Sequence, residues 1–251
     1  MNPRSFTVSG IIIRMADLGE SDRFITVLTP DRGKLTCIGK NLRTLKSRRN
    51  SQLELFSKVQ IQFWKSRNNY YLQDCKLEER HPELKKNLAS LASVAFIVEA
   101  TEKLTVDENH IPGLYDLLEE TLSLIEFYPK KHEVLREAYI IKLLSSIGTI
   151  SSFRTCSECR EKLPSESAFL DENHTTIHCV NCAEKKSSHL REIPLETLKL
   201  MHFILAHQIT AVLKLKMTRQ HINIIDEFGR TFLKHDLHYP LKSEAFLNTY
   251  G

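Results

Sequence analysis

A single change in hydrophobic period, near His81-Pro82, constrains the fold of this chain more than any other feature. Before it, residues alternate as in strands: Val59, Ile61 and Phe63 fall on one face, with Gln60, Gln62 and Trp64 on the other. After it, apolar residues recur every three or four positions, which is the spacing of one helix face. We therefore expect an α+β multidomain chain, strand-rich over residues 1–80 and all-α over 81–251.

The strand-rich part predicts a small barrel. Turn signals separate its apolar segments, such as Pro30-Asp31-Arg32-Gly33, which has proline second and glycine fourth as in a type I turn. Five short strands with such turns are typical of an antiparallel OB-fold barrel, a fold that often binds oligonucleotides. The expected strands span 6–14, 22–29, 34–39, 58–65 and 70–78.

The helical part predicts five helices and one interruption. Pro112 suits the first turn of the second helix, and Gly148 suits the end of a third helix over about 131–147. Helical spacing resumes after Pro194 and again from Thr218. Residues 153–187 break the pattern, so we expect them to loop out of a shared helical core. The first helix is expected to turn Leu84, Leu88, Leu91, Ala95 and Val98 inward.

Four of the six cysteines lie in this interruption, as two CxxC pairs. Cys156 and Cys159 are followed after 19 residues by Cys179 and Cys182. Each pair can place two thiolates on one tight turn, and two such turns supply the tetrahedral sulfur ligands that zinc prefers. The sequence therefore predicts a zinc ribbon at 153–187 holding one zinc ion.

Other readings of these cysteines are weaker. Disulfides are disfavoured because the chain shows no secretion signal and is expected to be cytoplasmic, and two pairs at this spacing argue against a redox role. His174 and His178 lie nearby and could replace a thiolate, but ordinary loop histidines are the simpler reading. Four protein ligands leave no open position for substrate, so the zinc should be structural.

The basic excess is concentrated at the start of the chain. Residues 1–80 hold 15 Lys and Arg against 8 Asp and Glu, although the net charge of the chain is only +4. Localised positive charge favours a polyanionic partner, but a merely solubilising face would have the same composition. The first-line candidates for DNA contact are Lys40, Arg43, Lys46, Arg48 and Arg49, and the second-line candidates are Arg32, Lys34, Lys65 and Arg67.

Aromatic residues of the fourth and fifth strands are candidates for stacking on bases. They are Phe63, Trp64, Tyr70 and Tyr71. Strand alternation places Phe63 in the core and Trp64 outside it.

No motif supports catalysis. The sequence lacks the GxxxxGK[ST] phosphate loop, GxGxxG, HExxH and GxSxG. A zinc-dependent nuclease or deaminase would need an open metal site, which four thiolates would close. The remaining rival to a DNA-binding protein is a protein–protein adaptor whose basic barrel serves only as a scaffold.

At its N-terminus the chain resembles the RecO family of bacterial recombination mediators. The likeness rests on Gly10-Ile11-Ile12-Ile13-Arg14, Gly19-Glu20, Asp22-Arg23, Leu28-Thr29 and Gly33. Lys40, Arg43 and Ser47 match the family's basic loop, approximately Lys-Gly-x-Arg-x-x-x-Ser. Asn41 replaces the usual glycine and Leu55 the usual proline of the Leu-Gln-Pro-Phe that follows; asparagine tolerates the left-handed conformation better than most residues.

The rest of the chain resembles the same family. The four-cysteine interruption matches, as do Leu237-His238, Leu241-Lys242-Ser243 and Phe246-Leu247. The resemblance implies a non-enzymatic DNA repair protein that binds single- and double-stranded DNA and anneals complementary strands. It also implies that, with RecR, the protein helps load RecA onto single strands coated by SSB. In the family the acidic C-terminal tail of SSB docks on the helical domain. The expected location is cytoplasmic, at the nucleoid.

Overall fold

The computed structural model of the chain describes residues 5–44, 47–67, 69–150, 153–163, 167–171, 176–186 and 190–251. By compactness these residues form two units. The first comprises Met1–Pro129 with Leu241–Gly251, and the second comprises Lys130–Pro240. Within the described residues, no helix combines the length and the apolar composition needed to cross a membrane.

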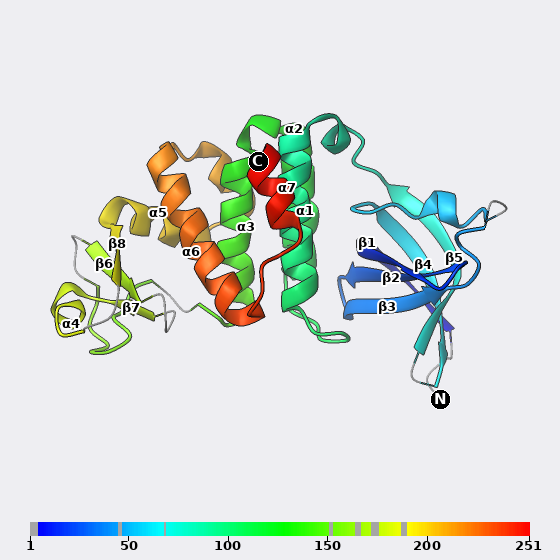
Figure 1. Cartoon of the computed structure of the whole chain (residues 1–251), viewed down its shortest axis with the longest axis horizontal. Coiled ribbons are helices and arrows are strands. Elements are labelled where there is room, and N and C mark those ends of the chain that lie inside the picture. Colours follow the sequence, from blue (N-terminus) through cyan, green and yellow to red (C-terminus); the bar gives the residue numbers. More distant parts are fainter. Residues whose placement is uncertain are drawn as a thin grey trace. The chain divides into compact units, whose positions relative to one another are not determined.

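The first unit begins with a closed five-stranded barrel, which confirms the predicted fold class (Figure 1). The strand order is β1-β2-β3-β5-β4, with β3 and β5 parallel and the other pairs antiparallel. The five strands are β1 (Ser5–Leu18), β2 (Asp22–Thr29), β3 (Gly33–Gly39), β4 (Lys58–Ser66) and β5 (Asn69–Glu79). All five lie where the period-two segments predicted them.

Two glycines of the barrel allow close approach of neighbouring backbone segments. β1 pairs with β4 through its first half and with β2 through its second half, and Gly10 lies near the change of partner. A Cβ at Gly10 would lie 2.7 Å from the Leu28 carbonyl oxygen, so only glycine permits this approach. Gly33 has a φ of +65°, and a Cβ there would lie 2.1 Å from the Asn109 carbonyl oxygen.

Three helices complete the first unit: α1 (Leu88–Leu104), α2 (Leu114–Phe127) and α7 (Ser243–Tyr250). The predicted inward face of the first helix is wrong at Leu88, which is 50% exposed. The period predicts a single buried face, whereas α1 is buried on most of its circumference, with small residues such as Ala92, Ser93 and Ala100 at close contacts. The C-terminal helix α7 was not predicted. Its start is held by Glu99 of α1, whose carboxylate accepts hydrogen bonds from the backbone N–H groups of Lys242 and Ser243.

The second unit is helical, and its helical pattern is interrupted where the sequence predicts, by a segment that contains a small sheet. Thr218 caps the longest helix: its hydroxyl accepts from the His221 backbone N–H, and the His221 ring accepts from the Thr218 backbone N–H. The three-stranded sheet, of order β7-β6-β8, was not predicted. The elements are α3 (His132–Ser146), β6 (Ser167–Asp171), β7 (Thr176–His178), α4 (Val180–Ala183), β8 (Leu190–Pro194), α5 (Leu195–Ala206) and α6 (Arg219–Leu237).

Candidate nucleic-acid interface and metal centre

The basic loop after β3 is fastened to the barrel by its own sequence. Leu42 is fully buried in the barrel core, and a Cβ at Gly39 would lie 2.1 Å from its Cδ1 atom. Asn41 has a φ of 55°, the left-handed conformation expected of it, and its backbone N–H donates to Asp22 at 2.9 Å. The loop therefore presents its cations from a fixed position, although Lys46 lies outside the described residues.

The guanidinium of Arg49 donates hydrogen bonds to backbone carbonyls. Its Nη1 atom donates to the carbonyls of Leu72 and Gln73 on β5, at 3.2 and 3.3 Å, and its Nη2 atom donates to the Lys40 carbonyl at 3.1 Å. The Cys75 thiol also lies 3.6 Å from the Arg49 carbonyl oxygen. Arg49 thus ties both ends of the loop to β5, a task that needs the planar fork of arginine.

Lys40 and Arg43 are exposed but paired with acids. Lys40 Nζ lies 2.6 Å from Asp22 Oδ2, and this hydrogen bond raises the pKa of Lys40 and lowers that of Asp22. Arg43 lies 3.4 Å from Asp17 and donates to the Gly19 carbonyl at 3.0 Å. Ion pairs of exposed cations contribute little to stability, so a phosphate can displace the carboxylates.

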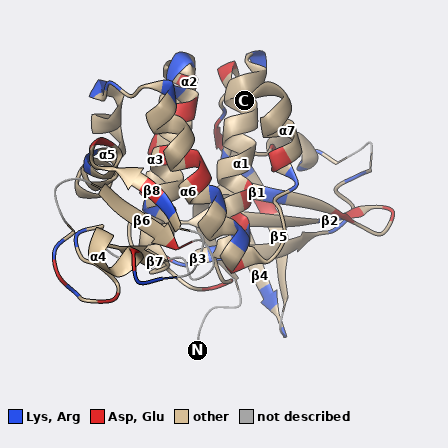
Figure 2. Cartoon of the chain, turned by 60° about the vertical axis from the view of Figure 1, so that its left-hand side comes forward, with Lys and Arg blue, Asp and Glu red and all other residues tan. Residues whose placement is uncertain are grey.

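Four further candidate cations of the barrel and its loops are exposed. Arg48 is exposed, and no ion pair links it to the described residues. Lys65 and Arg67 lie at the β4–β5 hairpin, and Lys65 Nζ lies 5.0 Å from the Tyr70 ring centroid. Figure 2 shows Lys and Arg positions of the chain in blue, including positions on β4. Arg32 lies over the Phe6 ring at 4.3 Å. These four side chains have positive charge facing solvent.

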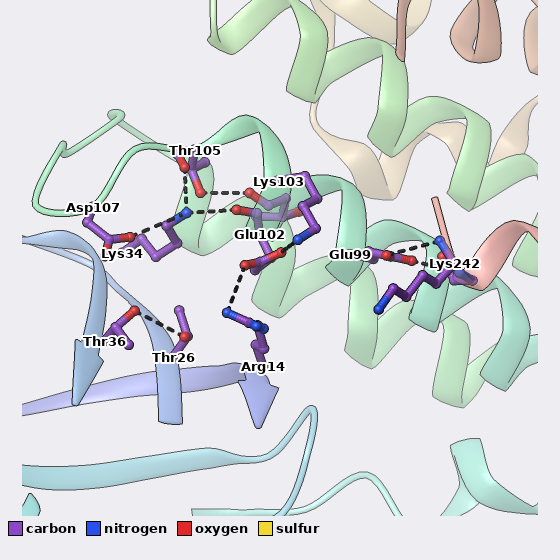
Figure 3. Close-up of polar contacts among 12 residues, drawn as sticks. Arg14, Thr26, Lys34, Thr36, Glu99, Glu102, Lys103, Thr105, Asp107 and Lys242 are labelled. Atoms are coloured by element: carbon purple, nitrogen blue, oxygen red, sulfur yellow. Dashed lines mark hydrogen bonds and ion pairs between the residues drawn. The ribbon is translucent and has the colours of Figure 1, made fainter. Parts of the chain in front are cut away.

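Lys34 is buried, unlike the other candidates that the structure describes. Its Nζ atom donates to the carbonyls of Glu102 and Thr105 at the end of α1, at 2.7 and 2.5 Å, and lies 3.4 Å from Asp107 (Figure 3). Only 10% of its side chain is exposed. Lys34 therefore satisfies carbonyls that the helix end leaves without partners, and we no longer propose it as a phosphate contact.

The aromatic candidates divide as strand alternation predicts. Phe63 is completely buried and Tyr70 nearly so, whereas Trp64 is 37% exposed. Tyr71 lies opposite Trp64 in the strand register, with ring centroids 5.8 Å apart. Trp64 and Tyr71 are thus the pair that faces outward.

The four cysteines of the CxxC pairs come together in the second unit. One sulfur from each residue lies within 4.8 Å of the others, and the Cys159 and Cys179 sulfurs are 3.8 Å apart. A tetrahedron of Zn–S bonds of about 2.3 Å has sulfur–sulfur edges of about 3.8 Å. The four thiols therefore fit a zinc-sized ion, and the 3.8 Å separation excludes a disulfide between Cys159 and Cys179.

The thiol pKa values agree with a site built for a cation. Burial raises the pKa of Cys156, but hydrogen bonds from backbone N–H groups of Cys179, Cys159 and Glu158 outweigh it and lower the pKa to about 6. Hydrogen bonding to Cys179 and burial raise the pKa of Cys182 to about 12. One thiolate is thus favoured already, and the rest of the cluster needs a positive ion before it can ionise fully.

A cationic cleft beside the ribbon was missed by sequence reasoning. It encloses about 340 Å³ over an apolar floor of Phe153, Leu195 and Leu198. Its other described lining residues are Arg154, Lys162, Leu163, Lys199 and His202, and none of them carries a carboxylate. Its cations are scattered over the sequence, so no local motif signals the cleft.

Comparison with known proteins identifies the family. Residues 1–80 match the family model "Recombination protein O N terminal", and residues 85–245 match "Recombination protein O C terminal". The chain is similar to "DNA repair protein RecO" of Thermoanaerobacter sp. (strain X514), with 24% identity over 98% of both chains. It is also similar to the protein of that name from Halalkalibacterium halodurans, with 28% identity over 95% of this chain and 92% of the relative. The chain belongs to the RecO family of DNA repair proteins.

Proposed function

We propose that this protein is a non-enzymatic recombination mediator that binds single- and double-stranded DNA and anneals complementary strands. With RecR it helps load RecA onto SSB-coated single strands in the cytoplasm. The observation that carries the proposal is a basic loop tied to a closed barrel, with Arg48, Lys40 and Arg43 exposed, in a chain of the RecO family. Cations of both the loop and the hairpin neutralise phosphates, which also reduces repulsion between two strands that are being paired.

The test is the salt dependence of DNA binding. Fluorescence anisotropy of a labelled single-stranded oligonucleotide is measured at several salt concentrations for the wild type and for Arg48→Ala/Arg67→Ala. Each lost phosphate contact should reduce the slope of log K against log salt by about 0.7, hence about 1.4 for the pair. The control, Lys214→Ala/Lys216→Ala, removes the same charge from exposed positions of the second unit and should keep the wild-type slope.

The results separate this function from its rival. If neither variant differs from the wild type, the loop and hairpin are not the DNA site. If the wild type binds no DNA at low salt, the protein is instead an adaptor whose basic barrel is a scaffold. If the protein hydrolyses DNA and Cys156→Ala keeps this activity, the protein is an enzyme whose activity does not depend on the cysteine cluster.

In this proposal the second unit recruits proteins, and its ribbon is folded by one structural zinc ion. Cys156, Cys159, Cys179 and Cys182 would hold the ion, and with four sulfur ligands it would leave no position for substrate. Zinc would replace protons on the thiols and fix an insert too small for a core of its own. Metal analysis of protein purified without added zinc tests this, with about one zinc per chain expected.

We propose that the SSB tail binds in the cationic cleft beside the ribbon. An acidic peptide with an apolar end suits a cleft whose floor is apolar and whose described lining has Arg154, Lys162 and Lys199 but no carboxylate. Binding of a labelled SSB-tail peptide should weaken in Arg154→Ala/Lys199→Ala and stay unchanged in Lys214→Ala/Lys216→Ala. If both variants bind the peptide equally, the SSB tail binds at another site.

A further inference from the structure

A row of apolar side chains crosses the outside of the barrel. Strand register places Phe24 of β2 opposite Ile38 of β3, Ile38 opposite Tyr71 of β5, and Tyr71 opposite Trp64 of β4. The residues that follow or precede them point the other way, because side chains alternate along a strand. Those neighbours, Ile25, Cys37, Tyr70 and Phe63, all belong to the buried core of the barrel. The row therefore lies on the outer face.

This row is open to solvent. Trp64 is 37% exposed, and Phe24, Ile38 and Tyr71 are partly exposed. A recess of about 210 Å³ adjoins Phe24 and Ile38, and polar groups of Thr36 and Asn69 also line it. An antiparallel sheet usually turns polar side chains to water, so a continuous apolar row across four strands indicates a surface that receives a ligand.

The charges near this row select the class of ligand. Lys40 is exposed and directly follows β3, two residues after Ile38. Lys65 and Arg67 continue the chain directly beyond Trp64. Asp107 and Glu108 line the recess, where carboxylates can accept hydrogen bonds but repel phosphate. Planar apolar surface between cations suits a polyanion that carries flat apolar groups.

We propose that the row Phe24–Ile38–Tyr71–Trp64 is a stacking platform for unpaired nucleobases and that it gives the barrel a preference for single strands over duplex. In a duplex the base faces are stacked on one another, whereas a single strand can lay them on aromatic side chains. The inference rests on the proposed function, because the strand must first be held through its phosphates. The specific addition is that base faces, and not only phosphates, contribute to binding.

The protein contains its own probe, because Trp64 is the only tryptophan. Its fluorescence is followed during titration with a single-stranded oligonucleotide, while anisotropy of a label on the DNA reports binding. Stacking should quench Trp64 with the normal oligonucleotide. An abasic oligonucleotide, with the same phosphates but no bases, should bind with the same salt slope, about tenfold more weakly, without quenching.

Two variants test the platform in the whole protein. Tyr71→Ala and Trp64→Ala should each weaken single-strand binding about tenfold while duplex affinity and the salt slope stay at wild-type values. Trp64→Phe keeps an aromatic face and should restore most of the affinity. Phe127→Ala, which removes a 76% exposed aromatic on α2, is the matched control and should change nothing.

The outcomes distinguish this inference from the proposed function. If the normal and abasic oligonucleotides bind equally and both leave Trp64 unquenched, the platform is refuted but phosphate binding stands. Equal losses of single-strand and duplex affinity in Tyr71→Ala also refute it. If no DNA binds at low salt, the platform and the proposed function fail together.

Discussion

Replacing Lys34 by methionine should destabilise the protein without changing how its DNA affinity depends on salt. The ammonium donates to two carbonyls at the end of α1, those of Glu102 and Thr105, and it is nearly buried (Figure 3). Hydrogen bonds from a charged donor contribute about 1.5–3 kcal/mol each, and desolvation of the ammonium offsets part of this. Methionine keeps the apolar stem but has no donor, so both carbonyls lose their partner.

From these contacts we expect a loss of about 3 kcal/mol in the free energy of unfolding. For a chain of this length that corresponds to a fall in Tm of about 6–12 °C. Calorimetry or urea unfolding measures the effect. The matched control is Arg14→Met: Arg14 also pairs with α1, at 3.7 Å from Glu102, but its side chain is half exposed. Removal of that exposed pair should cost less than about 1 kcal/mol.

DNA binding by Lys34→Met distinguishes a structural role of Lys34 at the helix end from a role as a phosphate contact. At a temperature where Lys34→Met is folded, its salt slope for single-stranded DNA should equal that of the wild type. A slope reduced by about 0.7 would make Lys34 a phosphate contact after all. A stability loss no larger than that of Arg14→Met would refute the helix-end role.

Three further predictions concern Arg49, the four clustered cysteines and Glu137. Arg49→Lys should lose as much DNA affinity as Arg49→Ala, because lysine cannot bridge three carbonyls; wild-type affinity in Arg49→Lys would show that charge alone suffices. Chelation or Cys156→Ser should release metal and make residues 153–186 exchange amide hydrogens faster, whereas Cys75→Ser should keep the metal; unchanged exchange would refute a structural ion. Burial raises the pKa of Glu137 to about 7 against the opposing charge of Arg136. Because the folded state then holds its proton to higher pH than the unfolded state, stability should fall by up to about 3 kcal/mol as pH rises from 5 to 8. Glu137→Gln should flatten this dependence, and an unaltered profile in urea titrations would contradict it.

The sequence was sufficient where local pattern decides structure. All five barrel strands follow from alternation and turn residues, and α2, α3 and α6 follow from helical spacing and from the boundary signals Pro112, Gly148 and Thr218, although α2 begins only at Leu114, two residues after Pro112. The cluster of four thiols that could hold a metal ion was also predictable, because each CxxC pair is a local turn. In each case the residues that determine the structure lie close together in the chain.

The sequence was insufficient where distant segments meet. Lys34 looks like one more cation of a basic region, and only its contacts with carbonyls 68 and 71 residues away make it structural. Leu88 has helical spacing but is exposed, since α1 is surrounded on other sides. The outward apolar row needs the register of β3 with β5, a parallel pair between strands that are not consecutive. Hydrophobic period carries no information on such pairings.

The burial of some cations changes what the basic composition means for binding. A count of charges treats Lys34 and Arg49 like Arg48, yet the first two already satisfy backbone carbonyls and would leave them unpaired if they turned to phosphate. Lys40 and Arg43 form an intermediate class, because each of these exposed cations is held by a carboxylate that a phosphate can replace. Binding there replaces a carboxylate by a phosphate and leaves the carboxylate without its partner. The net release of counterions is therefore smaller than for a phosphate bound by an unpaired arginine. The positive charge available to DNA is therefore smaller than the sequence implies, but it is held in a fixed place. With fewer cations, more of the selectivity for single strands depends on the apolar row between them.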